Sequence, residues 1–392
     1  MEFPSKKNIN VIGGGVFGIT AALELKLRGY EVSLFDRGSL PHPEASSTDI
    51  TKMIRADYGD DEFYADLMHE AFKGWDAWNE QFPRPMYHQT GFLMLMLQKM
   101  HPNSFEMKSL RVMQQRNYPV QRLHPDLLQK RFPEWAADKY PDGYYNARGG
   151  WAESGNVIAY LAQKAREAGV KIFENAGFQD FILENSRVVG ILSNGQIHPA
   201  AYTIVAAGAW TSTILPELKD CLKVIGQPVF HLLPKDPSSF RGEVFPGWSA
   251  DISVTGWYGF PAQPDGVVKI ANHGIGIVKD PNTELEIPAK YLVALRKFLI
   301  ESLPTLKDAP IVSTRICMYC DSWDGDFYID HHPEKPGLMV AAGGSGHGFK
   351  FAPILGGIIA DVLERKTNPY AHRWWWRAKG QPRYEAARST NF

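Results

Sequence analysis

The sequence has few cysteines and no excess of either charge. Only three of its 392 residues are cysteine, which is too few for the disulfide framework of a small secreted protein. Its 42 basic and 43 acidic residues give a formal net charge of −1. Because nucleic acids and anionic membranes attract strongly basic surfaces, we expect neither as the main partner. These absences favour a protein that acts on small molecules.

Long apolar runs and address signals are also missing. No run approaches the roughly 18–20 apolar residues that cross a bilayer. Residues 1–10 carry charges but no hydrophobic signal segment, and the last four residues are not a Ser-Lys-Leu type peroxisomal signal. We therefore expect a cytoplasmic protein without a membrane span. A chain of this length is expected to form about two domains.

A glycine-rich turn near the N-terminus organises the chain. The apolar run from Asn8 to Ile12 leads into Gly13-x-Gly15-x-x-Gly18, after which apolar residues recur at helical spacing. A second apolar strand ends on Asp36, 23 residues after Gly13. This βαβ unit predicts a dinucleotide site, with pyrophosphate at the helix N-terminus and ribose hydroxyls at Asp36. The expected contacts in this unit are Gly13, Gly15, Val16, Phe17, Gly18, Asp36 and Arg37.

Two later segments extend the predicted cofactor site. The apolar strand from Tyr202 runs into small residues, where we expect Ala207, Gly208 and Trp210 to contact the cofactor, although a plain tight turn uses such residues too. A second glycine-rich turn, 343–348, follows the last strand 330 residues after the first. Two turns could hold the two ends of one long cofactor, which favours FAD over NAD. The expected contacts there are Gly344, Gly346, His347, Gly348 and Lys350.

The order of the segments predicts an interleaved α/β fold. Helices are expected at 63–82, 156–168, 288–303 and 353–363, and a strand-rich segment spans 224–310. We predict a Rossmann-like FAD-binding domain, interleaved with a smaller α+β substrate domain that contains a mostly antiparallel sheet. The FAD-binding domain is assigned residues 1–85, 150–220 and 315–392, and the substrate domain residues 86–149 and 221–314.

At this point the sequence resembles the monomeric sarcosine oxidase and fructosyl amino acid oxidase family of FAD-dependent amine oxidases, which have a DAO-type fold. The resemblance runs in order from Asn8 to about Leu363. Besides the first turn it is carried by Thr51-Lys-Met-Ile-Arg-Ala-Asp-Tyr-Gly59, Tyr258-Gly-Phe-Pro261 with Lys269 and His273, Arg315-Ile-Cys-Met-Tyr319, and Ser345-Gly-His-Gly-Phe-Lys350.

The resemblance implies that Cys317 is joined through its sulfur to the flavin. A thioether to the flavin ring would fix the cofactor and withdraw electron density from it. Cys317 and Cys320 could instead form a redox CxxC pair or half of a zinc site. A zinc site needs two more ligands, and a redox pair usually opens a helix in a thioredoxin-like unit. The covalent link is therefore preferred, and no metal site is expected.

The resemblance also assigns the remaining site residues. Lys269 is implied to activate O₂ next to the flavin, since a fixed cation stabilises superoxide, although a strand lysine usually faces solvent. Arg55 and Lys350 are implied to bind the substrate carboxylate. For Arg55 a structural role near Asp57 stays open. The residues implied to line the substrate cavity are Tyr258, His273 and Tyr319, which are also ordinary core residues.

One departure from the family pattern affects the substrate. Sarcosine oxidases commonly carry His-x-x-x-Arg ahead of the clamp arginine, and this chain has Thr48 and Lys52 there, closer to the fructosyl amino acid oxidases. Lys52 is taken as a catalytic and cofactor-binding residue. We expect a monomeric oxidase that takes sarcosine or a similar N-alkyl or cyclic amino acid, with O₂ reduced to hydrogen peroxide. The alternatives are a fructosyl amino acid substrate, a flavin dehydrogenase that does not use O₂, or a non-catalytic flavin-binding protein.

Overall fold

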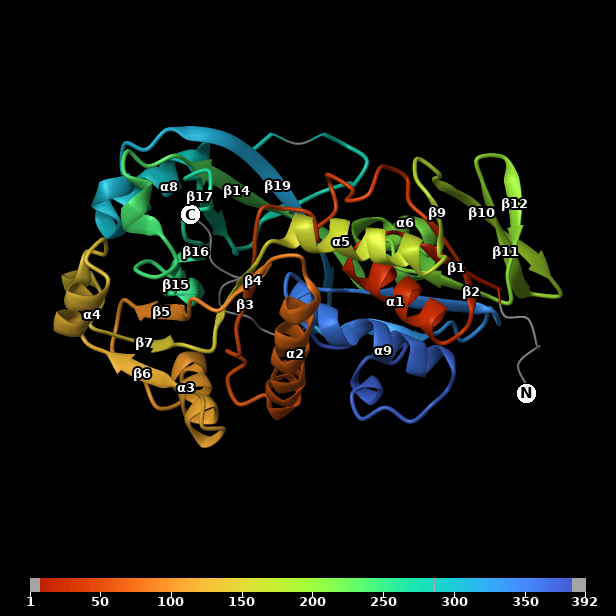
Figure 1. Cartoon of the computed structure of the whole chain (residues 1–392), viewed down its shortest axis with the longest axis horizontal. Helices are drawn as coiled ribbons and strands as arrows, with labels where there is room; N and C mark the ends of the chain where they lie inside the picture. The colour runs from red at the N-terminus through yellow and green to blue at the C-terminus, as the bar shows by residue number, and fades with distance from the viewer. Residues whose placement is uncertain (1–7, 285, 383–392) are drawn as a thin grey trace.

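A computed structural model describes residues 8–284 and 286–382 (Figure 1). A six-stranded sheet, parallel except for its edge strand β20, forms one half of the molecule. Its strands come from three stretches of chain that are far apart in the sequence. In spatial order they are β20 (Tyr328–His331), β21 (Leu338–Ala342), β13 (Tyr202–Val205), β1 (Asn8–Ile12), β2 (Glu31–Phe35) and β9 (Lys171–Phe173).

A nine-stranded sheet forms the other half and is antiparallel except for the pair β15 and β5. The long strands β14 and β19 arch over the top of the view in Figure 1. The spatial order is β18 (Ile277–Val278), β14 (Leu222–Leu232), β17 (Val268–Asn272), β16 (Trp257–Gly259), β15 (Gly247–Ala250), β5 (Phe92–Met96), β7 (Asp142–Asn146) and β6 (Val120–Leu123), with β19 (Ile311–Ser322) paired to β14.

Two three-stranded sheets complete the β-structure. One is a meander at the right of Figure 1, and the other joins the two halves near the middle of the molecule. The first contains β10 (Phe178–Glu184), β11 (Arg187–Ser193) and β12 (Gln196–Pro199), and the second β3 (Lys52–Ile54), β8 (Gly150–Ala152) and β4 (Tyr87–His88).

Helices cover the six-stranded sheet, where α1 packs against both α9 and α5. The α-helices are α1 (Val16–Leu27), α2 (Glu62–Gln81), α3 (Phe105–Gln115), α4 (Pro125–Arg131), α5 (Ser154–Glu167), α6 (Thr211–Ile214), α7 (Ile252–Thr255), α8 (Ala289–Ser302) and α9 (Ala352–Leu363). The 3₁₀ helices are η1 (Ala137–Lys139), η2 (Gly208–Trp210), η3 (Pro216–Leu218), η4 (Pro237–Phe240), η5 (Pro304–Leu306), η6 (Gly348–Phe351) and η7 (Ala371–Arg373).

Each half has its own hydrophobic core. The larger core packs the apolar residues of the six-stranded sheet against α1, α2, α5 and α9. The second core centres on Trp135, Trp248 and Trp257, which pack with α8 against the nine-stranded sheet. Local signals fix the helix ends: the Asp61 carboxylate accepts the Tyr64 N–H at the start of α2, which ends before Pro83.

The predicted fold class is confirmed, because a mostly parallel α/β half is interleaved along the chain with a mostly antiparallel half. All four predicted helices are present within two residues of their expected ends. The predicted domain boundary between residues 314 and 315 falls inside β19, which pairs with β14 along its length. The division into two domains therefore stays a prediction. Among the described residues, no helix is both long and apolar enough to traverse a lipid bilayer.

Candidate active site

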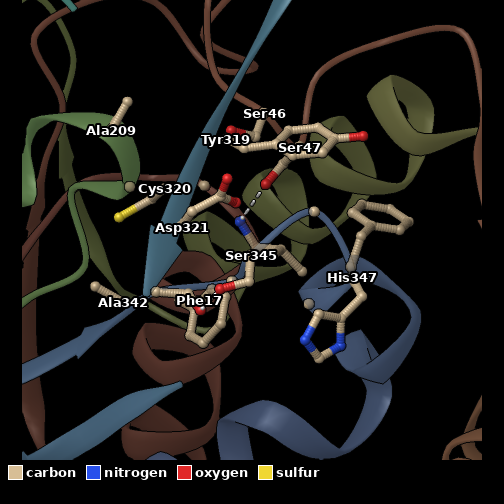
Figure 2. Close-up of a pocket in the computed structure, with 18 of the residues that line it drawn as sticks. Phe17, Ser46, Ser47, Ala209, Tyr319, Cys320, Asp321, Ala342, Ser345 and His347 are labelled. Carbon is tan, nitrogen blue, oxygen red and sulfur yellow. Dashed lines mark hydrogen bonds between the residues drawn. The ribbon is translucent and has the colours of Figure 1, made fainter. Parts of the chain in front are cut away.

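A cavity of about 1300 Å³ extends from the first glycine turn, Gly13–Gly18, to the nine-stranded sheet. Figure 2 shows the segments that meet around it: Ser46 and Ser47, Ala209, Tyr319 to Asp321, and Ser345 to His347, with Phe17 beside them. These segments lie up to some 330 residues apart in the sequence. The predicted site residues that line the cavity are Gly13, Gly15, Val16, Phe17, Asp36, Arg37, Lys52, Arg55, Ala207, Gly208, Trp210, Tyr258, His273, Tyr319, Gly344, Gly346, His347, Gly348 and Lys350.

The first glycine turn has no room for side chains. Gly13 has a φ of +100°, and a Cβ there would lie 2.5 Å from the Ala206 carbonyl oxygen. A Cβ on Gly18 would lie 1.8 Å from the Gly13 carbonyl oxygen. The turn therefore packs directly on the end of β13, and the N-terminus of α1 faces the cavity with Gly15 as its N-cap residue. Such a helix N-terminus is suited to phosphate groups.

Asp36 lies at the end of β2, as the sequence predicts, but backbone N–H groups donate hydrogen bonds to its carboxylate. Its Oδ2 accepts the Gly14 N–H at 2.7 Å and its Oδ1 accepts the Gly38 N–H at 3.0 Å. Burial raises the pKa of Asp36, and these N–H groups and His42 oppose the rise. The carboxylate fixes the first glycine turn, and its contact with a ribose stays a prediction.

Arg37 and Trp210 lie together at the cavity wall. The Arg37 guanidinium stacks over the Trp210 ring at 4.9 Å, and both side chains donate to the Asn282 Oδ1, at 2.8 Å and 3.0 Å. Next to them, Gly208 has a φ of +53°. This planar, partly cationic surface is suited to an aromatic base or a phosphate.

The second glycine turn, Gly343–Gly348, packs on aromatic side chains. A Cβ on Gly346 would lie 2.3 Å from the Tyr319 ring, and one on Gly344 would lie 3.2 Å from the Phe17 ring. His347 lies against the Gly325 carbonyl oxygen through Nε2, at 2.9 Å, and against the Tyr58 hydroxyl through Nδ1, at 3.1 Å. The turn thus lines the same cavity as the start of α1 and leads through η6 into α9.

Lys269 lies one layer behind the cavity wall. Its Nζ donates to the Asp49 Oδ2 and to the Thr51 carbonyl oxygen, both at 2.7 Å, and lies 4.6 Å from the ring of Phe260, which does line the cavity. Burial lowers the pKa of Lys269 to about 8, while the Asp49 charge opposes the decrease. The alternative that Lys269 faces solvent is wrong, because the residue is 1% exposed. Its role with O₂ stays a prediction.

Cys317 and Cys320 face different surroundings. Cys317 packs with Val229 and Ala271 behind the wall, and its Sγ lies 3.5 Å from the Lys52 Nζ. Cys320 belongs to another apolar cluster and lines the cavity, and burial raises the pKa of its thiol to about 11. Both cysteines are free thiols. Among the described residues, no group of three or more His, Cys, Asp or Glu side chains could hold a metal ion.

Arg55 and Lys350 approach the same short segment from two sides. The Arg55 Nη1 donates to the Asp57 carbonyl oxygen at 2.5 Å and lies 3.9 Å from the Asp57 Oδ2. The Lys350 Nζ donates to the Tyr58 hydroxyl at 3.1 Å. Burial raises the pKa of Asp57, opposed by the Arg55 charge, the Tyr144 hydroxyl and the Lys350 charge. Two cations and one carboxylate therefore give this part of the cavity a net positive charge.

The three predicted cavity aromatics also meet. The hydroxyls of Tyr258 and Tyr319 lie 3.3 Å apart, and the His273 ring lies 5.8 Å from the Tyr319 ring. They come from β16, from β19 and from the residue after β17, so that sheet pairing brings them together. The hydroxyl pair can donate to and accept from a bound polar group.

Sequence reasoning missed several residues that organise this site. Asp49 holds Lys269, and Tyr58 contacts Lys350. Ser47 was also missed, and its Oγ accepts the Val16 N–H at the start of α1. Tyr58 lies within the motif that carries the family resemblance, and Asp49 lies just before it. Of the missed residues, only Tyr58 therefore had a signal in the sequence.

Comparisons with known proteins show the family of this chain. The family of FAD dependent oxidoreductases matches residues 8–362. The chain is similar to monomeric sarcosine oxidase of Bacillus sp. (strain B-0618), 27% identical over 368 residues and covering 92% of this chain and 93% of that protein. It is also similar to N-methyl-L-tryptophan oxidase of Salmonella dublin, 29% identical over 375 residues, with coverage of 93% and 96%.

Solved structures share the whole fold. The deglycating enzyme fructosamine oxidase (Amadoriase II) of Aspergillus fumigatus has a TM-score of 0.86 to this chain at 25% identity, covering 100% of this chain and 95% of that one. L-proline dehydrogenase of P. horikoshii has a TM-score of 0.81 at 24% identity, with coverage of 94% and 96%. This second likeness concerns the fold alone.

Proposed function

This chain belongs to the family of FAD-dependent oxidoreductases, and from that membership we propose that it is an oxidase of N-substituted amino acids. The reaction removes two electrons and two protons from the CH–NH unit of a secondary amine, as a hydride from carbon and a proton from nitrogen. The imine product is hydrolysed by water, and O₂ is reduced to hydrogen peroxide. The observation that carries the proposal is the pair Arg55 and Lys350, because two cations on one cavity segment suit a carboxylate.

The residues present fit FAD as the resident cofactor. Two glycine turns face one elongated cavity, and each would clash with an added side chain. When bound, FAD would accept a hydride from the substrate and pass the electrons to O₂. The first glycine turn and the α1 N-terminus would hold the phosphates, and Arg37 with Trp210 would contact the nucleotide portion. The second glycine turn would hold the flavin portion, next to Tyr319.

The protein groups around the substrate would orient it and exclude water. Lys350 and Arg55 would bind the carboxylate, and the Tyr258 and Tyr319 hydroxyls would lie beside the reacting amine. A secondary amine must be neutral at nitrogen before it loses hydride, so an acceptor for its proton is needed. His273, next to Tyr319 in the cavity wall, is the proposed acceptor.

We propose the covalent flavin link at Cys317. Lys52 Nζ, 3.5 Å from Sγ, can stabilise the thiolate, which is the reactive form of cysteine. Acid-precipitated protein should stay yellow, and Cys317→Ser should release the colour into the supernatant. Cys320→Ser is the matched control and should retain the colour. If Cys320→Ser releases the flavin and Cys317→Ser does not, the link lies at Cys320.

We propose sarcosine or a similar N-alkyl or cyclic amino acid as the first candidate substrate and a fructosyl amino acid as the second. The names of the relatives include both N-methyl amino acid and fructosamine oxidases. Lys52, where sarcosine oxidases commonly carry arginine, supports the fructosyl alternative. We also propose that the enzyme acts as a monomer, as the name of the Bacillus relative states for that protein.

The experiment measures hydrogen peroxide released from sarcosine, proline, pipecolate, N-methyltryptophan and fructosyl-valine. The proposal expects peroxide from at least one of them. Substrate-dependent bleaching of the flavin without oxygen consumption in air would instead identify a dehydrogenase. No bleaching and no peroxide with any of the five would overturn the proposal.

A further inference from the structure

The strongest feature that the proposed function leaves unexplained is a buried carboxylate surrounded by cationic groups. Asp49 lies in the segment before β3, and its carboxylate is 1% exposed. We call it and its four neighbours the Asp49 cluster. From Asp49 Oδ2 the Lys269 Nζ is 2.7 Å away and the Lys52 Nζ 3.9 Å, and from Oδ1 the His231 Nε2 is 3.5 Å away and the Arg315 Nη1 4.0 Å.

These neighbours come from four different strands. Lys269 lies on β17, directly opposite His231 on β14, which also pairs with β19, the strand of Arg315. Lys52 begins β3. The Asp49 carboxylate is therefore placed over three adjacent strands of the nine-stranded sheet.

The start of α5 fixes the backbone of Asp49. Its carbonyl oxygen accepts the Ser154 hydroxyl and the Gly155 N–H at the start of α5, both at 2.9 Å. Its own Oδ1 accepts the Ile50 N–H at 2.8 Å. These hydrogen bonds hold the Asp49 side chain in place. Asp49 therefore loses little conformational freedom when it pairs with the cations of the Asp49 cluster.

The charges of the Asp49 cluster do not cancel. Lys269, Lys52 and Arg315 carry three positive charges around one carboxylate, and the Cys317 thiol lies beside Lys52. Burial raises the pKa of Asp49, but Lys269, His231, Lys52 and Arg315 outweigh this effect and hold it well below its usual value. Asp49 is therefore ionised at neutral pH and keeps mutually repelling cations together.

We propose that Asp49 is a positioning residue that favours the charged form of Lys269 and holds its Nζ behind Phe260 of the cavity wall, next to the proposed site of oxygen chemistry. The catalytic consequence rests on the proposed function, whereas the electrostatic coupling of Asp49 to Lys269 belongs to the protein alone. A merely structural ion pair would stabilise the fold without setting the charge state of Lys269.

The first test reads the charge of Lys269 directly in the full protein and needs no activity measurement. Lysine labelled with ¹³C at Cε is titrated by NMR, and the Lys269 signal is assigned by its loss in Lys269→Met. In the wild type its pKa should lie near 8. In Asp49→Asn, loss of the partner charge should lower this pKa by about one to three pH units. An unchanged titration would overturn the inference.

The second test uses the holoenzyme and a matched control. The pH profile of flavin reoxidation by O₂ should shift to lower pH in Asp49→Asn by the same amount, and Asp49→Glu, which keeps the charge, should largely restore it. Asp142, on β7, is another buried carboxylate and is paired with Arg122 of β6. Asp142→Asn should change stability without moving either titration. If Asp142→Asn shifted the Lys269 titration or the pH profile by the same amount, the effect of Asp49→Asn would reflect a general loss of stability.

The two tests separate the inference from the proposed function. If the wild type releases no peroxide but the Lys269 titration shifts in Asp49→Asn, the coupling stands and the oxidase proposal fails. If peroxide is released and the titration does not shift, the oxidase proposal stands and the role of Asp49 fails. Should Asp49→Asn not fold, the double variant with Lys269→Met is expected to recover folding, because the unpaired buried cation is gone. No recovery would contradict the coupling.

Discussion

The first glycine turn and the Asp49 cluster serve one cavity but differ in what supplies their polar groups. At Gly13–Gly18 the polar groups are backbone N–H groups and the N-terminus of α1, and the side chains are absent so that main chains can touch. In the Asp49 cluster they are charged side chains from four strands and a loop. The first region should therefore be most sensitive to an added atom at Gly13 or Gly18. The second should tolerate changes of shape but no change of charge.

The largest expected effect removes a charge from the Asp49 cluster. Lys269→Met should slow reoxidation of the reduced flavin by O₂ by about 10²–10³-fold, the usual scale for losing one preorganised electrostatic group. Stopped-flow measurement of the two half-reactions checks this, and reduction by substrate serves as the internal control. Equal slowing of both half-reactions would show that Lys269 only maintains the fold.

The next effect concerns the carboxylate clamp. Lys350→Ala leaves a bound carboxylate partly unpaired, which costs about 1.5–3 kcal/mol for a charged hydrogen bond. The Kd of a simple carboxylate inhibitor should therefore rise roughly 10- to 150-fold. Calorimetric titration measures it, with a neutral amine of similar size as the control ligand. An unchanged Kd for the carboxylate would remove Lys350 from the site and weaken the case for an amino-acid substrate.

A steric change tests the other region. Gly18→Ala forces a Cβ to within 1.8 Å of the Gly13 carbonyl oxygen, and such overpacking typically lowers the free energy of unfolding by about 1–3 kcal/mol. The flavin content of the purified protein should fall as well. Urea unfolding and the flavin-to-protein absorbance ratio are the measurements.

A matched glycine substitution controls for helix propensity. Gly357 lies in α9 with nothing within 4 Å of a built Cβ. Gly357→Ala should raise the free energy of unfolding by roughly 0.4–1 kcal/mol and leave the flavin content unchanged. If the two variants behave alike, the tight packing of the first glycine turn has no special role.

The smallest expected effect is on the free energy of unfolding and concerns Asp251, a buried carboxylate that accepts a backbone hydrogen bond. Asp251, the N-cap residue of α7, accepts the Leu97 N–H at 3.1 Å, and burial raises its pKa to about 6, with Glu106 adding to the rise. The folded state therefore binds more protons than the unfolded state between about pH 4 and pH 6, so this group makes stability fall as pH rises through that window. Asp251→Asn should raise the free energy of unfolding at pH 7 by about 1 kcal/mol.

Urea unfolding at several pH values checks this last expectation. The gain from Asp251→Asn should shrink towards pH 4, where the wild-type carboxyl is protonated in the folded state. Asp49→Asn should have the opposite sign at pH 7, because cations stabilise that carboxylate. Two variants with the same sign would show that the surrounding charges do not distinguish the two aspartates.

The elements of the fold could be read from the sequence where the signal is local. The helices 62–81, 154–167, 289–302 and 352–363 follow from apolar spacing, and the β10–β11 hairpin follows from its polar turn. The interface between halves could not be read this way. The predicted boundary at residue 315 cuts through β19, since a long strand can leave one sheet and approach another without any change in its residue pattern.

The candidate site divides in the same way. Most of the predicted residues line one cavity, yet Lys269 and Cys317 lie behind its wall, and Asp36 bonds to backbone N–H groups. Asp49 and Tyr58 were not predicted, because a buried carboxylate or tyrosine in a loop has no periodic pattern. Their importance appears only when distant strands bring cations to them.

The sequence by itself determined the glycine turns, four of the helices and the family, because each depends on residues that are close in the chain or on motifs in a fixed order. Only the tertiary structure decided which charges face each other. Asp49 meets Lys269, 220 residues later, and Lys350 meets Tyr58, 292 residues earlier. Electrostatic energies depend on distances of a few ångströms and on burial, and strand pairing, rather than local spacing, sets both.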